Sequence, residues 1–398
     1  MIKAVYAAIR GADRRAWQLA VAETLAWAGM YYLFPVLLLH WERDQGWSRG
    51  DLSIALTMAF VVAALGAPMT GRLIDRGYGR RVLISSAVLG GLSLAALAFV
   101  NTLTMFFLVW FVIGVAMAGC LYEPCFAFVT HTRSDGAQRV ITLITLAAGF
   151  ASTIAFPIAG AVADGWGWRA SAGLFAALIL GVAVPLFWFG TAADPTDAPQ
   201  APHHKSGQSV SASPWSRRAF WFLACAFSTT GLAHGMLISH LLPLLDERGA
   251  TPEMALLTAS LIGPMQVAGR VALMSFDHRI SVYFVTGFSF VFMITATFIL
   301  YVAGAVMAGL LLFAILQGTG FGVTSITKPV VTVRIMGRAN FGAISGALAV
   351  PYMMSYAFAP SVAAQVWQVG GYDAVLLLAI LLPMIGFFAF YVARLGHR

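Results

Sequence analysis

Three ionisable side chains, Arg270, Glu123 and Glu23, lie inside long, mostly apolar segments of the sequence. A charge at the centre of a membrane helix costs roughly 2.5–3.5 kcal/mol on insertion scales, so such a residue usually faces a cavity or a charged partner. We therefore treat these three residues as the first candidates for ligand binding or proton transfer.

The three residues differ in the chemistry that their side chains can perform. Arg270 cannot lose its charge by deprotonation, so its guanidinium must bind an anionic substrate or a protein carboxylate, or snorkel to the membrane surface. We predict the substrate role. Glu123 can titrate and is predicted to carry a coupling proton, the alternatives being a static partner for an arginine or a bond at a helix end. Glu23 is a second proton-coupling candidate. Pro124 predicts a bend beside Glu123, and Lys328, near the end of its segment, is expected to snorkel.

Aromatic and imidazole side chains accompany these charges at related depths. Tyr31, Tyr122 and Tyr352 could donate hydrogen bonds to a carboxylate or stack on a ring. His234 could likewise face a cavity. The alternative for each of them is ordinary packing or contact with lipid.

The most specific local motif is the run from Gly71 to Arg81, GRLIDRGYGRR, between two apolar segments. It resembles the loop signature of the major facilitator superfamily, with one extra residue between Arg76 and Gly79. Asp75 could cap a helix N-terminus or pair with an arginine across the bundle and so latch one conformation. We predict a gating role for Asp75, Arg76 and Arg80; the alternative is a simple basic loop.

The elements that hold these residues must be long apolar helices. Of 398 residues, 60% are hydrophobic and 10% are charged, against about 25% charged in a typical soluble domain. A soluble fold of this length could not bury so much apolar surface, but a bilayer removes that need. Because one span takes about 20 apolar residues, we predict an all-α membrane protein with twelve transmembrane helices, at 16–41, 51–73, 81–100, 104–130, 138–162, 169–190, 218–244, 254–276, 281–301, 304–330, 339–365 and 372–394.

The longest polar interruption, residues 191–216, falls near the midpoint and has three prolines in its first half. It predicts a flexible cytoplasmic linker between two six-helix bundles, residues 1–190 and 217–398. The two halves echo each other: Gly29-Met30 resembles Gly235-Met236, and Glu42-Arg43 resembles Glu247-Arg248. Their shared order predicts a duplicated, pseudo-symmetric unit, as in many secondary transporters.

Lysine and arginine are distributed unevenly over the two sides of this topology. With the N-terminus in the cytoplasm, nineteen of the 24 lie on the cytoplasmic side and four, Arg43, Arg49, Arg169 and Arg248, on the outer side. This asymmetry satisfies the positive-inside rule and predicts a multi-pass inner-membrane protein with both termini in the cytoplasm. It explains the net charge of +8 better than nucleic-acid binding does, because the basic residues are spread over short loops.

The motifs of enzymes and metal sites are missing from the sequence. Cys120, Cys125 and Cys225 lie in apolar stretches without the spacing of a metal site or a disulfide framework. There is no phosphate-binding loop, paired histidine ligand set or serine nucleophile elbow. We predict a protein that is not an enzyme and that uses no cofactor or metal.

Several short stretches resemble the monocarboxylate transporter family and its bacterial oxalate/formate-type relatives, within the major facilitators. They are Tyr32-Leu33-Phe34-Pro35, Gly46-Trp47-Ser48-Arg49, Gly165-Trp166-Gly167-Trp168-Arg169, Val267-Ala268-Gly269-Arg270, and the region from Gly320-Phe321-Gly322 to Asn340-Phe341-Gly342. The resemblance implies that Arg270 binds an anion and that spans 1, 4, 7 and 10 line the cavity.

Two positions depart from that family's pattern. Val36 stands where many members have a lysine, and Gln266 stands where many have an aspartate four residues before the arginine. Because Gln266 cannot titrate, it is counted with the substrate-binding residues, and Glu123 is the best replacement as proton carrier.

The prediction that joins these observations is a monomeric secondary transporter that moves a small, monocarboxylate-like organic anion by alternating access, coupled to protons. Two alternatives stay open. One is transport of a larger aromatic or vitamin-like solute, for example a flavin, or drug efflux, with Arg270 paired to a protein group. The other is a membrane sensor or scaffold that does not transport.

Overall fold

The structure is a computed structural model that describes residues 13–133, 136–192, 217–276 and 281–395. Every regular element within these ranges is a helix, which confirms the predicted all-α fold. Most of the predicted linker, residues 193–216, and the two ends of the chain lie outside the described residues.

The helices of the N-terminal half follow the six ranges predicted from hydropathy to within a few residues. Several spans are divided by a short π-helical turn (η) or by a break. The elements are α2 (Arg14–Trp27), η1 (Ala28–Tyr32), α3 (Leu33–Gln45), α4 (Arg49–Leu73), η2 (Ile74–Tyr78), α5 (Gly79–Leu97), α6 (Leu103–Cys120), α7 (Tyr122–Thr132), α8 (Ala137–Ala148), α9 (Ala151–Trp166), α10 (Trp168–Leu178), η3 (Ile179–Ala183) and α11 (Val184–Gly190).

The C-terminal half contains five longer helical stretches: α12 (Arg218–Glu247), α13 (Pro252–Phe276), α14 (Val282–Ala303), α15 (Met307–Met336) and α16 (Phe341–Leu395). The backbone of α16 leaves helical geometry at Gly370 and Gly371, where φ is −149° and 65°. The second value favours glycine. This stretch is therefore two helices joined at a sharp bend, in agreement with the last two predicted spans.

The break between α6 and α7 follows from the sequence around Pro124. Proline has no N–H group to donate to the carbonyl four residues earlier, which here belongs to Cys120. The helix α6 ends at Cys120, and Leu121 adopts an extended conformation before α7 begins. The break at Pro124 therefore places Glu123 in the first turn of α7.

Nine described helical stretches are long and apolar enough to cross a membrane. Two of them, Asp51–Leu97 and Phe341–Leu395, contain 47 and 55 residues, whereas one crossing takes about 20. Each has a glycine with positive φ, Gly77 or Gly371, near its middle. The helices α8 and α9 together fill one more predicted span, which the sequence had suggested to be continuous. The arrangement is consistent with twelve crossings.

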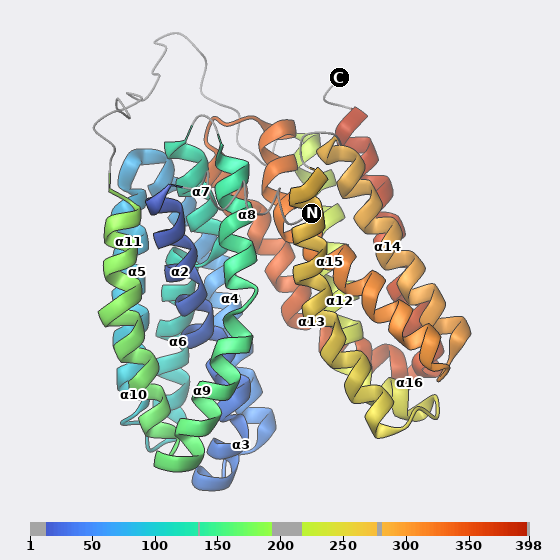
Figure 1. Cartoon of the computed structure of the whole chain (residues 1–398), viewed down its shortest axis with the longest axis horizontal. Helices are drawn as coiled ribbons and strands as arrows, with labels where there is room; N and C mark the ends of the chain where they lie inside the picture. The colour runs from blue at the N-terminus through green and yellow to red at the C-terminus, as the bar shows by residue number, and fades with distance from the viewer. Residues whose placement is uncertain (1–12, 134–135, 193–216, 277–280, 396–398) are drawn as a thin grey trace.

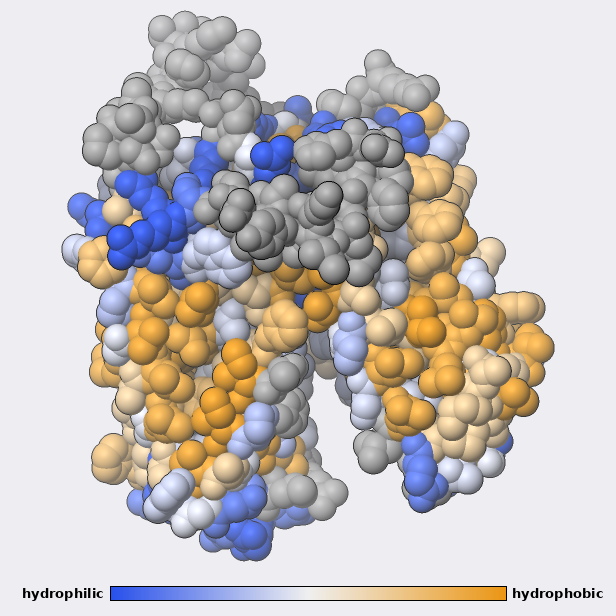
Figure 2. All heavy atoms as spheres, in the orientation of Figure 1, coloured by the Kyte–Doolittle hydropathy of each residue, from blue (hydrophilic) through white to orange (hydrophobic). Residues whose placement is uncertain are grey.

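The two halves form two bundles that lean together at one end and diverge at the other (Figure 1). We call the first end, which carries η2 and the start of α16, the closed end, and the other the open end. At the closed end α4 packs against α16. Figure 2 shows apolar side chains over the flanks, polar ones at both ends, and a groove between the bundles that widens toward the open end. The interface between the bundles is therefore where a binding site is expected.

Candidate functional site

An ion pair between Lys328 of α15 and Glu123 of α7 joins the two bundles. The Lys328 Nζ lies 3.0 Å from Glu123 Oε1, and the two side chains are only 16% and 19% exposed. The same ammonium lies 3.9 Å from the centroid of the Tyr352 ring, a cation–π contact. The expectation that Lys328 snorkels to the membrane surface is therefore wrong, because its charge is paired inside the protein.

Arg270 of α13 also reaches across the interface. Its Nη1 donates to the carbonyl oxygen of Thr145 in α8 at 2.8 Å, and its Nε donates to that of Gly322 in α15 at 3.1 Å. The residue is buried, and no carboxylate contacts it within the described ranges. Its charge is therefore solvated by neutral carbonyls without being neutralised. Gln266, one turn earlier on α13, is half-buried and packs through its backbone against Gly322.

Asp75 caps the first turn of α16 from the opposite bundle. Its two carboxylate oxygens accept hydrogen bonds from the backbone N–H groups of Gly342, at 2.8 Å, and Ala343, at 2.7 Å. The first N–H groups of a helix have no partner within it, and the helix dipole favours a negative charge there. Of the two contacts expected for Asp75, the described structure contains the helix cap.

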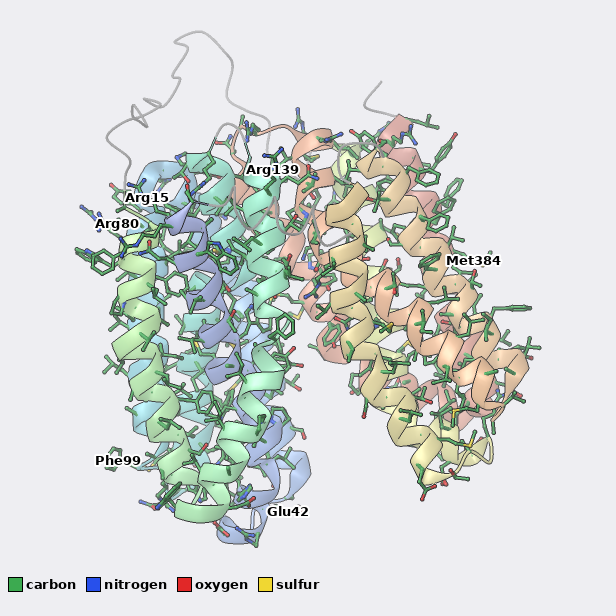
Figure 3. All side chains as sticks on the ribbon, viewed as in Figure 1. Arg15, Glu42, Arg80, Phe99, Arg139 and Met384 are labelled. Carbon is green, nitrogen blue, oxygen red and sulfur yellow. The ribbon has the colours of Figure 1, made fainter. Side chains whose placement is uncertain are left out.

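The two arginines predicted to act with Asp75 lie elsewhere. Arg76 is exposed. The guanidinium of Arg80 stacks on the ring of Trp188, 4.5 Å from its centroid, within the N-terminal bundle. Figure 3 shows Arg80 on the flank of that bundle that faces away from the C-terminal bundle. The geometry therefore brings Asp75 to the interface and leaves Arg76 and Arg80 outside the cap.

Glycines allow the bundles to touch backbone to backbone beside Asp75. A Cβ atom added to Gly71 of α4 would overlap the carbonyl oxygen of Gly342, and one added to Gly346 would overlap that of Ala67. Close approach of this kind is typical of small residues at helix interfaces in membranes. The closed end is thus shaped by backbone contacts that leave no room for a methyl group.

Tyrosines from both bundles surround these charges. Tyr122 and Tyr352, from opposite bundles, both lie within electrostatic range of Arg270. Tyr31 of η1 likewise lies within electrostatic range of Tyr356 of α16, in the opposite bundle. The three predicted substrate-binding tyrosines are therefore brought to one interface region, with Arg270 among them.

His234 of α12 lies deeper in the C-terminal bundle, against Gln317 of α15. The Nδ1 atom of His234 is 3.1 Å from Nε2 of Gln317, and both residues are buried. The imidazole stacks on the ring of Phe321 with centroids 3.5 Å apart. The sequence analysis missed Gln317 because the side chain carries no charge; the signal that could have found it is an amide inside the apolar run LLLFAILQ.

Glu23 of α2 is fully buried. Among the described residues, neither of its carboxylate oxygens makes a hydrogen bond of normal geometry, although the side chains of Cys125 and Trp27 lie beside it. The charge of Glu123 acts on it electrostatically. An ionised carboxylate is costly in such surroundings, so Glu23 remains a candidate for holding a proton.

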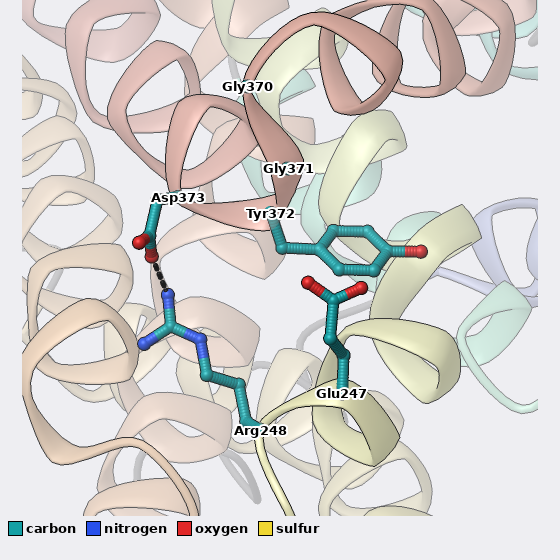
Figure 4. A pocket seen from close by; sticks show the side chains of 6 residues that line it. All are labelled: Glu247, Arg248, Gly370, Gly371, Tyr372 and Asp373. Carbon is teal, nitrogen blue, oxygen red and sulfur yellow. Dashed lines mark hydrogen bonds and ion pairs between the residues drawn. The ribbon is translucent and has the colours of Figure 1, made fainter.

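A separate pocket of about 310 Å³ lies at the open end of the C-terminal bundle. It is lined by Glu247, Arg248, Tyr372, Asp373 and the glycines at the bend in α16, and Arg248 pairs with Asp373 (Figure 4). Its side chains all come from one bundle. The pocket is therefore apart from the charges at the interface between the bundles.

The family model of the Major Facilitator Superfamily matches residues 19–360. The chain belongs to the major facilitator superfamily. As a superfamily member it is a multi-pass membrane transporter and not an enzyme, which confirms that part of the sequence prediction. The narrower resemblance to the monocarboxylate transporters stays a prediction.

Solved transporters of the superfamily share this fold over nearly the whole chain. The E. coli fucose:proton symporter FucP aligns with a TM-score of 0.73 at 16% identity, covering 94% of this chain and 97% of that one. The human organic anion transporter MFSD10 (TETRAN) aligns with a TM-score of 0.69 at 16% identity, covering 94% and 98%. At this identity the likeness concerns the fold alone.

A curated relative, the multidrug resistance protein MdtH of Aeromonas salmonicida, is 25% identical over 132 residues. The match spans 33% of this chain and 33% of that relative. Such a partial match leaves the substrate to be argued from the site of this chain.

Proposed function

We propose that this transporter moves a small organic anion by alternating access, coupled to protons, as a monomer in the inner membrane with both termini in the cytoplasm. The assignment of an anionic substrate rests on the balance of charge at the interface between the bundles. Two cations, Arg270 and Lys328, lie there, and Glu123 is the one carboxylate ion-paired to either of them within the described residues. An anionic solute would neutralise the remaining guanidinium charge, and Arg can bind a carboxylate in a bidentate manner.

Alternating access is supported by which contacts cross the interface. The Asp75 cap, the Lys328–Glu123 pair and the Arg270–Thr145 hydrogen bond all join one bundle to the other near the closed end. Opening of that end must break all of them. The positive-inside pattern supports a cytoplasmic closed end, in which case this conformation would face outward; a FucP structure of the same fold is described as outward.

Proton coupling is assigned to the Glu123 carboxylate, with Glu23 as a second proton site. An anion bound at Arg270 would compete electrostatically with Glu123 for the Lys328 ammonium, because Tyr352 lies close to all three charges, and would so weaken the Lys328–Glu123 pair. The released carboxylate would then take a proton, and the neutral form would let the bundles separate without exposing an unpaired buried charge. Electrostatic contact between Glu23 and Glu123 would favour one shared proton over two negative charges.

A second candidate function is transport of an aromatic solute, including drug efflux. Tyrosines from both bundles line the same region, and Trp27 packs on Tyr122 at a centroid distance of 4.8 Å. The name of the partial relative, a multidrug resistance protein, points the same way. In that case Arg270 would serve the protein by holding the two bundles together, and carboxylates would not compete for the site.

Counterflow in proteoliposomes, with a panel of carboxylates and of neutral aromatic solutes, tests these candidates. For an anion carrier we expect exchange of carboxylates, and a loss of about tenfold or more in apparent affinity in Arg270→Lys, because lysine lacks the bidentate fork. Arg80→Lys is the matched control, because Arg80 lies on the flank of the N-terminal bundle that faces away from the interface. Full exchange of every carboxylate in Arg270→Lys would refute the anion site, and absence of any exchange would favour a sensor.

The coupling step needs its own variant. Glu123→Gln should retain carboxylate counterflow, which requires no net proton movement, and should lose accumulation driven by a pH gradient. Accumulation that persists in Glu123→Gln and stops in Glu23→Gln would assign the proton to Glu23. Accumulation that persists in the double variant would remove both carboxyls from the mechanism.

A further inference from the structure

The buried pair His234–Gln317 has hydrogen-bonding capacity that the protein does not use. The Gln317 Oε1 atom is buried and without a partner among the described residues. The Nδ1 atom of His234 contacts the Gln317 amide, so the Nε2 atom, on the other side of the ring, takes no part in this hydrogen bond. Buried polar atoms are nearly always paired in folded proteins, so an unpaired one indicates a missing partner.

The unused atoms always comprise a donor and an acceptor. If the Gln317 amide nitrogen donates to Nδ1, then His234 Nε2–H is a free donor and Gln317 Oε1 a free acceptor. If the amide is turned, Nδ1–H donates to the oxygen, and the free groups are the amide N–H and the Nε2 lone pair. In both arrangements the pair matches a neutral group that can both donate and accept, such as a hydroxyl or an amide.

The pair also lies at the depth where transporters bind their solutes. Gln317 is ten residues from the start of α15, or about 15 Å along the helix, half of a hydrocarbon core of about 30 Å. The ring of His234 stands 6.4 Å from that of Tyr356, and Tyr356 lies within electrostatic range of Tyr31 of the other bundle. Tyr356 is therefore close both to the pair and to the bundle interface.

We propose that His234 and Gln317 form a subsite for a hydroxyl or amide group of the transported solute, admitted when Tyr356 turns aside. This inference rests on the proposed anion function, because it takes Arg270 as the site of the carboxylate. Arg270 is anchored on Gly322, five residues after Gln317 on α15, a rise of about 8 Å. The solute is then an extended hydroxy- or amido-carboxylate whose two polar ends lie at least about that far apart, the reach of two extended peptide residues.

Binding of matched carboxylates to the purified transporter, measured by thermal shift over a concentration series, tests the subsite. The probes are 6-hydroxyhexanoate against hexanoate, whose hydroxyl can reach the pair, and lactate against propionate, whose hydroxyl cannot. We expect 6-hydroxyhexanoate to bind about tenfold or more tightly than hexanoate, because a site built to hydrogen-bond rejects the analogue that lacks the group. Lactate and propionate should bind alike.

The variant Gln317→Leu should abolish the preference for 6-hydroxyhexanoate while hexanoate affinity stays the same. Thr258→Val, another change of a buried polar residue, should leave the preference intact. Equal binding of the long pair in the wild type, or a preference that survives Gln317→Leu, would overturn the subsite and mean that only a structural water fills it; the anion proposal would stand. If no carboxylate in either series binds, the anion proposal fails and the subsite fails with it.

Discussion

Removing one partner of the Lys328–Glu123 ion pair should open the closed end. Both side chains are more than four-fifths buried, and loss of one partner from a buried pair typically costs about 3–5 kcal/mol, because the other charge is left without compensation. Residual exposure and the Tyr352 ring over Lys328 place the cost near the lower figure. About 3 kcal/mol corresponds to roughly a hundredfold shift in the ratio of closed to open molecules, at about 1.4 kcal/mol per tenfold.

The shift can be measured without knowing the substrate. Spin labels at Tyr78 and Leu395, both about half exposed and on opposite bundles at the closed end, report their separation as a distance distribution. The labels are placed in a protein whose three cysteines have been replaced by alanine. We expect the short-distance population to dominate in the parent protein and to fall in both Glu123→Gln and Lys328→Met.

The double variant separates a pairwise effect from a loss of fold. In Glu123→Gln/Lys328→Met no charge remains buried and unpaired, so most of the closed population should return. Asp373→Asn is the matched control, because its ion pair with Arg248 lies within one bundle. If either single variant leaves the distribution within about threefold of the parent, or if the double variant is as open as the two singles combined, the pair does not hold the closed end.

Three further predictions concern the closed end. Asp75→Asn should weaken the cap on α16 by about 1–2 kcal/mol and lengthen the same label distance, whereas Arg76→Gln should not. Gly71→Val should prevent closure, because its side chain would overlap a carbonyl of α16; Gly160→Val, at a position with open space, should have no effect on the distance. Burial by itself would raise the pKa of Asp13. Hydrogen bonds from Arg133 and from the backbone N–H of Ala16, together with nearby arginine charges, outweigh burial and hold the pKa of Asp13 below its ordinary value of 3.8. The stabilising contact is then complete above about pH 4 and is lost as pH falls through the lowered pKa, so the difference in Tm between wild type and Asp13→Asn should be constant from about pH 8 to 5 and vanish in stronger acid.

The helices were predictable because their causes are local. Apolar length gave the spans, and Pro124 gave the break that ends α6 at Cys120. The Asp75 cap was foreseeable as a residue type in a loop between helices, but the helix that it caps, 267 residues later in the chain, was not. The partner of Lys328 was missed for the same reason. A lysine near a helix end can reach the membrane surface by snorkelling, and no local feature of the sequence indicates a carboxylate 205 residues away.

Sequence alone predicts a membrane protein of two six-helix halves, because hydropathy and charge asymmetry can be read from each segment separately. It also marked Arg270, Glu123 and Glu23 as charges that need an explanation. Their partners follow from the three-dimensional arrangement: Lys328 for Glu123 and two carbonyls for Arg270, whereas Glu23 makes no hydrogen bond of normal geometry within the described residues. Pairing between buried charges depends on which helices become neighbours, and that is set by packing of the whole interface.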